Sequence, residues 1–137
     1  MSCFNDTVLL IEDDADDAEI AISALNKLKL PKLIHLDDGA IALEYLFASS
    51  TKPPAVILLD LKMPKVDGIE ILAKLKNDLA RKNIPVVALI SSKEGRKYVE
   101  SFRLSPEGYL IKPIDTRNFV SVLREIGLAH LVCATAV

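Results

Sequence analysis

Short runs of consecutive apolar residues occur five times along the chain, and amphipathic stretches separate them. Each run is continuous in its apolar character instead of alternating with polar residues. This pattern is typical of strands that are buried on both faces of a parallel sheet. It predicts five strands, at residues 8–11, 33–36, 56–59, 86–90 and 109–111.

The stretches between these runs have the spacing of helices. Apolar residues recur every three or four positions, so that they line one face of a helix. Three such stripes are Ala18, Ala21, Ile22 and Leu25, then Ile69, Leu72, Leu75 and Leu79, and finally Phe119, Val122, Leu123 and Ile126. Two further helices are predicted over residues 39–48 and 93–103, the second with a face diluted by charged residues.

Five β–α repeats joined by right-handed crossovers predict an α/β fold with a doubly wound, five-stranded parallel sheet. The expected strand order is 2-1-3-4-5, the flavodoxin-like arrangement. Residues 1–137 contain no linker or low-complexity tract and are expected to form a single domain. Residues 128–137 are apolar for a terminal segment, so they pack on the last helix, extend a surface used for pairing, or fray.

Composition and charge exclude several classes of protein. Seventeen basic residues against nineteen acidic ones give a net charge of −2, which does not favour nucleic acid as a partner. No apolar run reaches the roughly 18 residues of a membrane span, and no signal peptide pattern opens the chain. Cys3 and Cys133 lie far apart without metal-ligand spacing, so reduced thiols in a cytoplasmic protein are expected.

Polar residues collect where the predicted strands end, which is where open α/β sheets bind ligands. The first strand is followed by Glu12, Asp13 and Asp14, and the third ends in Asp60. The fourth is followed by Ser91-Ser92 and the fifth by Lys112. Because the first and third strands are neighbours in the predicted order, Asp60 is expected to face the acidic residues.

Carboxylates that converge in one pocket repel one another unless a cation compensates them. Oxygen ligands without a nearby histidine or cysteine favour a hard ion such as Mg²⁺. A cation beside Lys112 would suit a phosphoryl group, and a carboxylate can itself be the nucleophile. Taken singly, the acidic run could be helix-dipole charge, Asp60 a turn residue and Lys112 a solvated amine; their joint placement favours the site.

Three sequence blocks carry a family resemblance. Val-Leu-Leu-Ile-Glu-Asp-Asp at 8–14, Leu-Leu-Asp-Leu-Lys-Met-Pro-Lys-Val-Asp-Gly at 58–68 and Tyr-Leu-Ile-Lys-Pro at 109–113 resemble the signature blocks of response-regulator receiver domains, which are CheY-like. The resemblance covers residues 6 to 127. Within the family, the chain resembles the small single-domain regulators that are partnered with bacterial phytochromes and hybrid histidine kinases.

The resemblance implies a role for each residue of the site. Asp60 would be the phosphoacceptor. Mg²⁺ would be held by the carboxylates of Glu12, Asp13 and Asp60 and by the backbone carbonyl of Lys62. Lys112 would pair with the phosphoryl oxygens.

Three residues outside these roles also match the family pattern. The bond between Lys112 and Pro113 is expected to be cis. Gly68 would open the third helix after a tight turn. Asp14 is expected to cap the first helix.

The switch region departs from the family pattern. The family places a Thr or Ser hydroxyl at the end of the fourth strand, and an ungapped match puts Ile90 there. Either a one-residue bulge brings Ser91 into the site, or the hydroxyl is missing; we favour Ser91 as the phosphoryl-binding hydroxyl. Tyr109 would be the aromatic partner of this switch, although it also suits a half-buried position on an edge strand.

The expected function follows from the resemblance. The chain would accept a phosphoryl group from a histidine kinase, a hybrid kinase or a phosphotransfer protein, and would signal through a partner or a homodimer. It would not be an enzyme beyond catalysing its own phosphorylation and slow dephosphorylation, which Lys62 would slow further by shielding the group.

Two rival functions are compatible with a similar sheet. A pseudo-receiver would bind a partner without phosphorylation, which Ile90 favours and the intact acids oppose. An aspartyl phosphatase would need a second acid where Lys62 stands.

Overall fold

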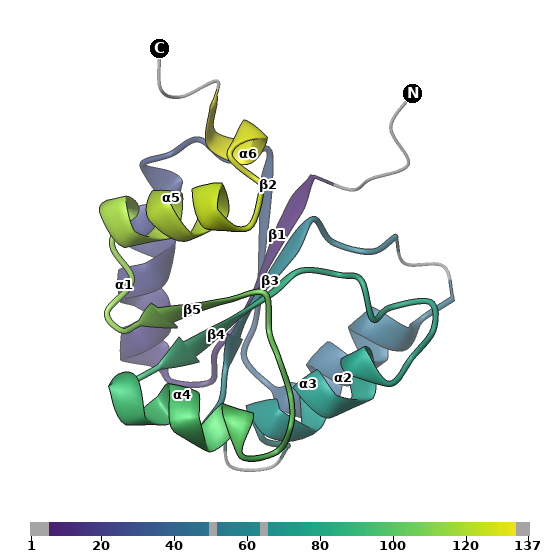
Figure 1. Cartoon of the computed structure of the whole chain (residues 1–137). Coiled ribbons are helices and arrows are strands. Elements are labelled where there is room, and N and C mark those ends of the chain that lie inside the picture. The colour runs from purple at the N-terminus through teal and green to yellow at the C-terminus, as the bar shows by residue number, and fades with distance from the viewer. Residues whose placement is uncertain (1–5, 50–51, 64–65, 134–137) are drawn as a thin grey trace.

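The computed structural model describes residues 6–49, 52–63 and 66–133, which form one sheet with helices on both of its faces (Figure 1). The strands are β1 (Thr7–Ile11), β2 (Lys32–Leu36), β3 (Val56–Asp60), β4 (Val86–Ile90) and β5 (Gly108–Ile111). The helices are α1 (Ala15–Asn26), α2 (Gly39–Phe47), α3 (Gly68–Lys76), α4 (Lys93–Glu100), α5 (Thr116–Glu125) and α6 (His130–Cys133).

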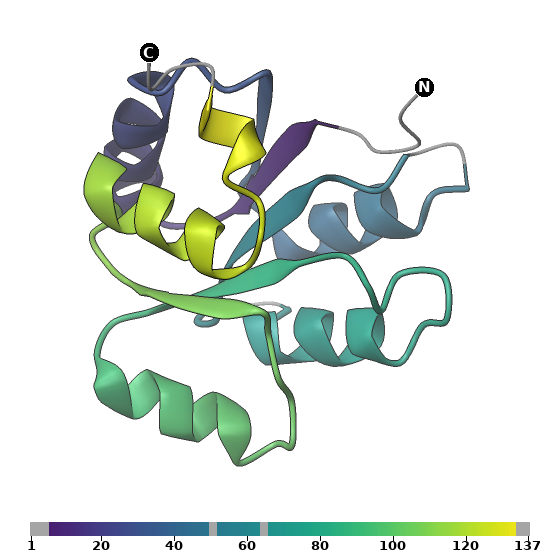
Figure 2. The same cartoon turned by 45° about the horizontal axis from the view of Figure 1, so that its top comes forward.

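All four strand pairs are parallel, and the order across the sheet is β2-β1-β3-β4-β5. This order confirms the predicted doubly wound, flavodoxin-like fold. It places β1, β3 and β4 in the centre, where each residue of the strand is buried, while β2 at the edge is partly exposed. Figure 2 shows the twist of the sheet between its two helical layers.

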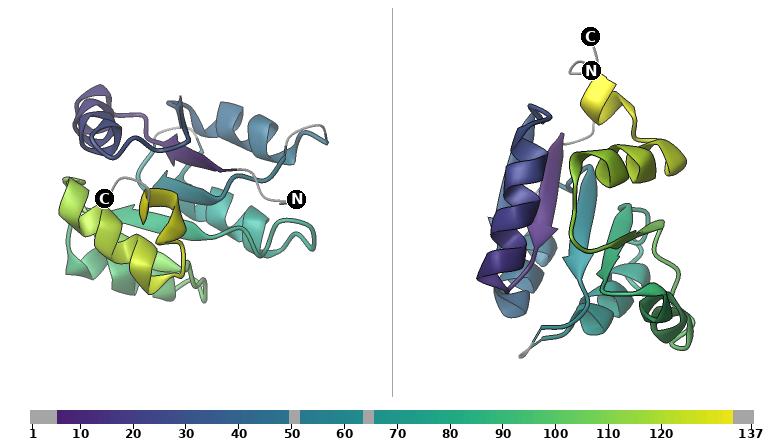
Figure 3. Two further views of the ribbon diagram at one scale, coloured as in Figure 1. Left: turned by 90° about the horizontal axis from the view of Figure 1, so that it is seen from above. Right: turned by 90° about the vertical axis from the view of Figure 1, so that its left-hand side faces the viewer.

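Two apolar clusters, one on each face, hold the helices to the sheet. Alternate strand residues point to opposite faces, so Leu9 joins the cluster under α2, α3 and α4, and Leu10 joins the cluster under α1, α5 and α6. Figure 3 shows the helices on the two faces of the sheet from above and from the side. The three central strands are therefore packed on both faces, which holds their carboxyl ends rigidly in place.

Aspartate side chains define the first turns of four helices. Each accepts a hydrogen bond from a backbone N–H that the helix itself leaves unpaired; these residues are Asp14, Asp38, Asp67 and Asp115. For α1, the Asp14 carboxylate accepts from the Asp17 N–H at 2.9 Å. The predicted capping role of Asp14 is confirmed, and Gly68 opens α3 as expected.

Two helices end earlier than their sequence patterns predict. Leu79 completes the apolar stripe of α3 in the sequence, yet its side chain is 84% exposed because the helix ends at Lys76. The Asn77 side chain donates to the Ala73 carbonyl at 2.8 Å and closes the last turn. Similarly, α4 ends at Glu100 and the chain turns away at Arg103, where φ is 58°.

The apolar segment after α5 folds back on the molecule as far as it is described. Leu131 and Val132 of α6 are buried in the same cluster as Phe119. Residues 134–137, like Cys3, lie outside the described residues. Each helix in the described part of the chain is too short or too polar to cross a membrane.

Candidate functional site

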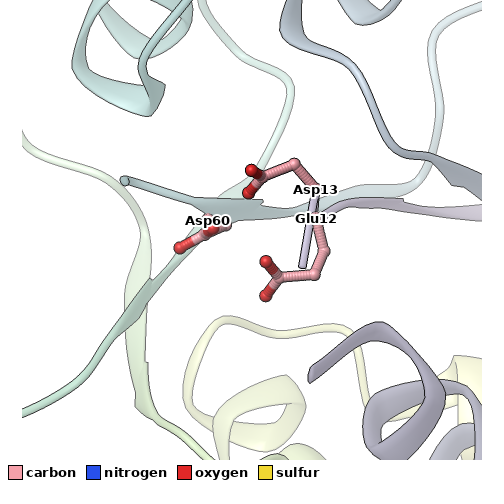
Figure 4. A group of neighbouring side chains, drawn as sticks. All are labelled: Glu12, Asp13 and Asp60. Carbon is pink, nitrogen blue, oxygen red and sulfur yellow. The ribbon is translucent and has the colours of Figure 1, made fainter. Parts of the chain in front are cut away.

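Acidic side chains meet at the ends of β1 and β3. Glu12 and Asp13 follow the last residue of β1, and Asp60 is the last residue of β3. Figure 4 shows how the three carboxylates gather at this edge of the sheet. One oxygen from each carboxylate lies within 4.8 Å of the others, so the expected proximity of Asp60 to the acidic pair is observed.

Burial makes this cluster electrostatically unfavourable for its charged forms. Glu12 and Asp60 are only 1% and 3% exposed. Burial, a hydrogen bond with Asp60 and the negative charge of Asp60 raise the pKa of Glu12 to about 8, against a smaller opposing effect of Lys112. Burial also raises the pKa of Asp13, and the charge of Asp60 adds to the effect. Both shifts indicate negative charge that the protein compensates only in part.

The carboxylate cluster fits a hard divalent cation. Its ligand atoms are all oxygens, which suits Mg²⁺ or a similar ion, and a single ion can contact all three at their mutual distances. The His35 ring is turned elsewhere and contacts the Glu12 carbonyl oxygen at 2.8 Å. The Lys62 N–H donates to Asp60 at 3.3 Å, which places the backbone of residue 62 next to the cluster.

Lys112 supplies the positive charge of the site. It follows β5, and its N–H donates to the Ile90 carbonyl oxygen at 2.8 Å, while the peptide bond to Pro113 is cis as predicted. Its Nζ lies 3.3 Å from an Asp60 oxygen and 3.2 Å from a Glu12 oxygen. Burial alone would lower the pKa of Lys112, but the hydrogen bond with Asp17 and the charges of Asp60 and Glu12 outweigh it and raise the pKa.

Asp17 is a contact of Lys112 that sequence reasoning missed. Its Oδ2 lies 3.0 Å from Nζ, nearer than either buried carboxylate. Asp16 and Asp17 lie in the first turn of α1, where acidic residues are favourable to the helix dipole. That explanation sufficed for both residues and gave no reason to expect a contact with Lys112. The signal was the position of Asp17 on α1: it stands four positions before the buried Ala21, and therefore on the same face of the helix, whereas Asp16 is exposed.

Two of the three residues predicted for the switch, Ile90 and Ser91, line a cleft together with Asp60 and Lys112. Pairing between β4 and β5 continues one to one as far as Ile90, so β4 contains no bulge that would turn Ser91 inward. Ser91 is exposed just beyond the strand. Its role as the phosphoryl-binding hydroxyl stays a prediction.

Ile90 itself packs under α4 instead of facing an empty space. Its side chain is buried in the cluster that also contains Val99. The backbone of α4 approaches Ile90 so closely that position 95 requires a glycine, because a Cβ there would lie 2.7 Å from the Ile90 Cβ. Tyr109 is half-buried beside this contact with the Arg96 guanidinium 4.9 Å from its ring centre, and its role as switch partner stays a prediction.

Comparison with known proteins identifies one family. The model of the response regulator receiver domain matches residues 8–124. Response regulator Rcp1 of Synechocystis is 33% identical over 125 residues, covering 87% of this chain and 84% of Rcp1.

Solved structures of receivers resemble this fold along most of its length. The bacteriophytochrome response regulator RtBRR is 40% identical with a TM-score of 0.83, covering 89% of this chain and 78% of that one. A Mn²⁺-bound form of Rcp1 is 30% identical with a TM-score of 0.72, covering 94% and 96%. The phosphorylated cyanobacterial phytochrome response regulator RcpA is 30% identical with a TM-score of 0.70, covering 97% of each chain.

Proposed function

We propose that this chain, which belongs to the response regulator receiver family, accepts a phosphoryl group on Asp60 in a two-component signalling pathway. One observation carries the proposal: the carboxylates of Glu12, Asp13 and Asp60 converge within 4.8 Å at the strand ends, and Lys112 Nζ lies 3.3 Å from Asp60. This arrangement joins a nucleophile, a cation site and a fixed positive charge.

The reaction would be an in-line transfer from a phosphohistidine donor. An Asp60 oxygen attacks phosphorus and forms the new O–P bond, while the N–P bond breaks and its electron pair stays on the imidazole nitrogen. Lys112 faces Asp60 from the β5 side and would pair with an oxygen of the transferred group. Later attack by water would release inorganic phosphate and regenerate the carboxylate.

Mg²⁺ is the proposed cofactor, with Glu12, Asp13, Asp60 and the Lys62 carbonyl as ligands. Bound there, it would offset negative charge on the phosphoryl oxygens. The raised pKa values of Glu12 and Asp13 support this proposal, because a cation would compensate the charge that the protein leaves uncompensated. The Mn²⁺-bound form of Rcp1 and the phosphorylated form of RcpA are further support from the family.

The proposed donor is a histidine kinase, a hybrid kinase or a phosphotransfer protein. Similarity to the bacteriophytochrome response regulator RtBRR supports a bacteriophytochrome as the sensor kinase. Phosphorylation would then shift an existing equilibrium at the surface of α4 and β5. Tyr98 and Ile111 expose 50% and 42% of their surface there, which suits a partner or a second copy of the chain.

A titration of Mg²⁺, followed by beryllofluoride as a phosphoryl mimic, tests the proposal by calorimetry. The chain is expected to bind Mg²⁺ and then to bind beryllofluoride only while Mg²⁺ is present. A pseudo-receiver would give no Mg²⁺-dependent binding of the mimic, and this result would refute the phosphoacceptor assignment.

Lys62 is proposed to lengthen the life of the phosphoryl group. Its exposed side chain stands two residues after Asp60, where a long cation can shield phosphorus from water. Lys62→Asn is expected to lose phosphate about three to ten times faster than the parent, equal to roughly 0.6–1.4 kcal/mol of barrier. The decay of phosphorylated chain, measured by intact mass, gives the rate.

Lys62→Met is the matched control, since it keeps most of the length without the charge. If the length of the side chain provides the shielding, phosphorylated Lys62→Met should lose phosphate at nearly the rate of the parent. Equal rates for Lys62→Asn and the parent would exclude the shielding role.

A further inference from the structure

Lys112 Nζ contacts three carboxylates at once in the unphosphorylated chain. Asp17, Glu12 and Asp60 lie at 3.0, 3.2 and 3.3 Å from it. An ammonium group has three N–H donors and no acceptor, so these contacts use its full capacity. A phosphoryl oxygen on Asp60 can therefore bind Lys112 only if one of the three carboxylates gives up its hydrogen bond.

The three contacts differ in how easily they can be released. The Glu12 side chain is 1% exposed, and its other oxygen accepts from the Asp14 N–H at 3.2 Å, so release would leave a buried carboxyl oxygen without its partner. Asp60 is the residue that carries the phosphoryl group. The Asp17 side chain is 40% exposed and regains water when it is released, which makes its contact the least costly to lose.

The backbone fixes Asp17 in this competing position. Asp14 caps α1 by accepting from the Asp17 N–H, and its carbonyl accepts from the Ala18 N–H, each at 2.9 Å. The Asp17 carboxylate is thus presented to Lys112 by the first turn of a capped helix. A negatively charged phosphoryl group bound to the same ammonium would be repelled by this carboxylate.

We infer that Asp17 is a positioning residue that holds Lys112 in the unphosphorylated chain and competes with the phosphoryl group for it. The inference rests on the proposed phosphorylation of Asp60 and adds a residue that opposes it. Asp17 lowers the affinity of the site for a phosphoryl group without taking part in the transfer. It thereby sets how readily the phosphorylated state forms.

Two charge-matched variants test this role. Asp17→Asn removes the competing charge and keeps the size of the side chain. Asp16→Asn, one residue earlier in the same helix turn, removes the same charge from an exposed side chain that does not contact Lys112. Mg²⁺ is titrated first and beryllofluoride second, at low and at high salt, into the parent chain and both variants.

Asp17→Asn is expected to bind beryllofluoride about three to ten times more tightly than Asp16→Asn, with a smaller gain at high salt. Its affinity for Mg²⁺ alone should equal that of Asp16→Asn or fall below it, because the released lysine can turn to Glu12 and Asp60. A merely structural role of Asp17 would instead weaken both ligands together.

Different results would refute the competition by Asp17 and the proposed phosphorylation of Asp60. Equal beryllofluoride affinities in the two variants, or weaker binding by Asp17→Asn, would overturn the competition while leaving phosphorylation intact. Absence of Mg²⁺-dependent beryllofluoride binding by the parent chain would overturn the proposed function and this inference with it.

Discussion

Asp60→Asn is expected to abolish phosphoryl uptake from a small-molecule acyl phosphate donor, with a loss of at least about a hundredfold in rate. An asparagine amide has nearly the shape of the carboxylate but is not a nucleophile for phosphorus. The change also removes one of the three carboxylates that converge at the strand ends, so Mg²⁺ should bind more weakly. Intact-mass measurement after incubation with donor and Mg²⁺ gives the result directly.

The fold should survive this substitution, which keeps the experiment interpretable. An amide oxygen can still accept from the Lys62 N–H and from Lys112, the two donors to Asp60 Oδ1. Removing its charge also relieves repulsion with Glu12, whose pKa the charge of Asp60 helps to raise. Without Mg²⁺, the thermal midpoint of Asp60→Asn should therefore be no lower than that of the parent.

Asp16→Asn is the control for the loss of one acidic residue and should take up phosphate like the parent. If Asp60→Asn gained a phosphoryl group at the rate of the parent, another residue would be the acceptor. The assignment of the site to Asp60 would then be wrong.

Gly68→Ala is expected to destabilise the chain by about 2–4 kcal/mol. Gly68 opens α3 directly against β3, where a Cβ would lie 2.3 Å from the Asp60 carbonyl oxygen and 2.5 Å from the Leu61 Cα. Both neighbours are backbone atoms, which no rotamer change can move away. The first turn of α3 or the end of β3 must shift, so beryllofluoride affinity should fall together with the free energy of unfolding.

Gly108→Ala is the comparison for Gly68→Ala in urea unfolding. A Cβ there would lie 2.8 Å from Val122 Cγ2, the end of a side chain that can yield. A loss of about 1 kcal/mol is expected, distinctly less than at Gly68. Equal losses in the two variants would show that the close approach to Asp60 is not the source of the cost.

The fold and most of the site could be predicted because they depend on local patterns. Continuous apolar runs identify the buried strands, and parallel strands bring their carboxyl ends to one edge whatever the details of the loops. This is why Glu12, Asp13 and Asp60 could be placed together from the sequence. Lys112 followed for the same reason, as the residue after the last strand.

Features that depend on helix ends or on one rotamer were not predictable in this way. Leu79 continues the apolar spacing of α3, but the Asn77 side chain ends that helix first. The contact between Asp17 and Lys112 joins residues 95 positions apart and depends on the rotation of α1. For Ser91, the direction of the chain beyond β4 decides where the hydroxyl points, and strand alternation does not extend past Ile90.

The contact between Ile90 and Gly95 has a consequence for how this sequence can change over evolution. Because Ile90 fills the volume that a side chain at position 95 would need, the two positions are tied to each other. A threonine at position 90 would keep the Cβ and the Cγ2 that would lie 2.7 and 2.8 Å from a Cβ at position 95, so it would not make room for a side chain there. A hydroxyl at the end of β4 is therefore open to a single substitution of Ile90, whereas a side chain at position 95 also requires the backbone of α4 to move away from β4.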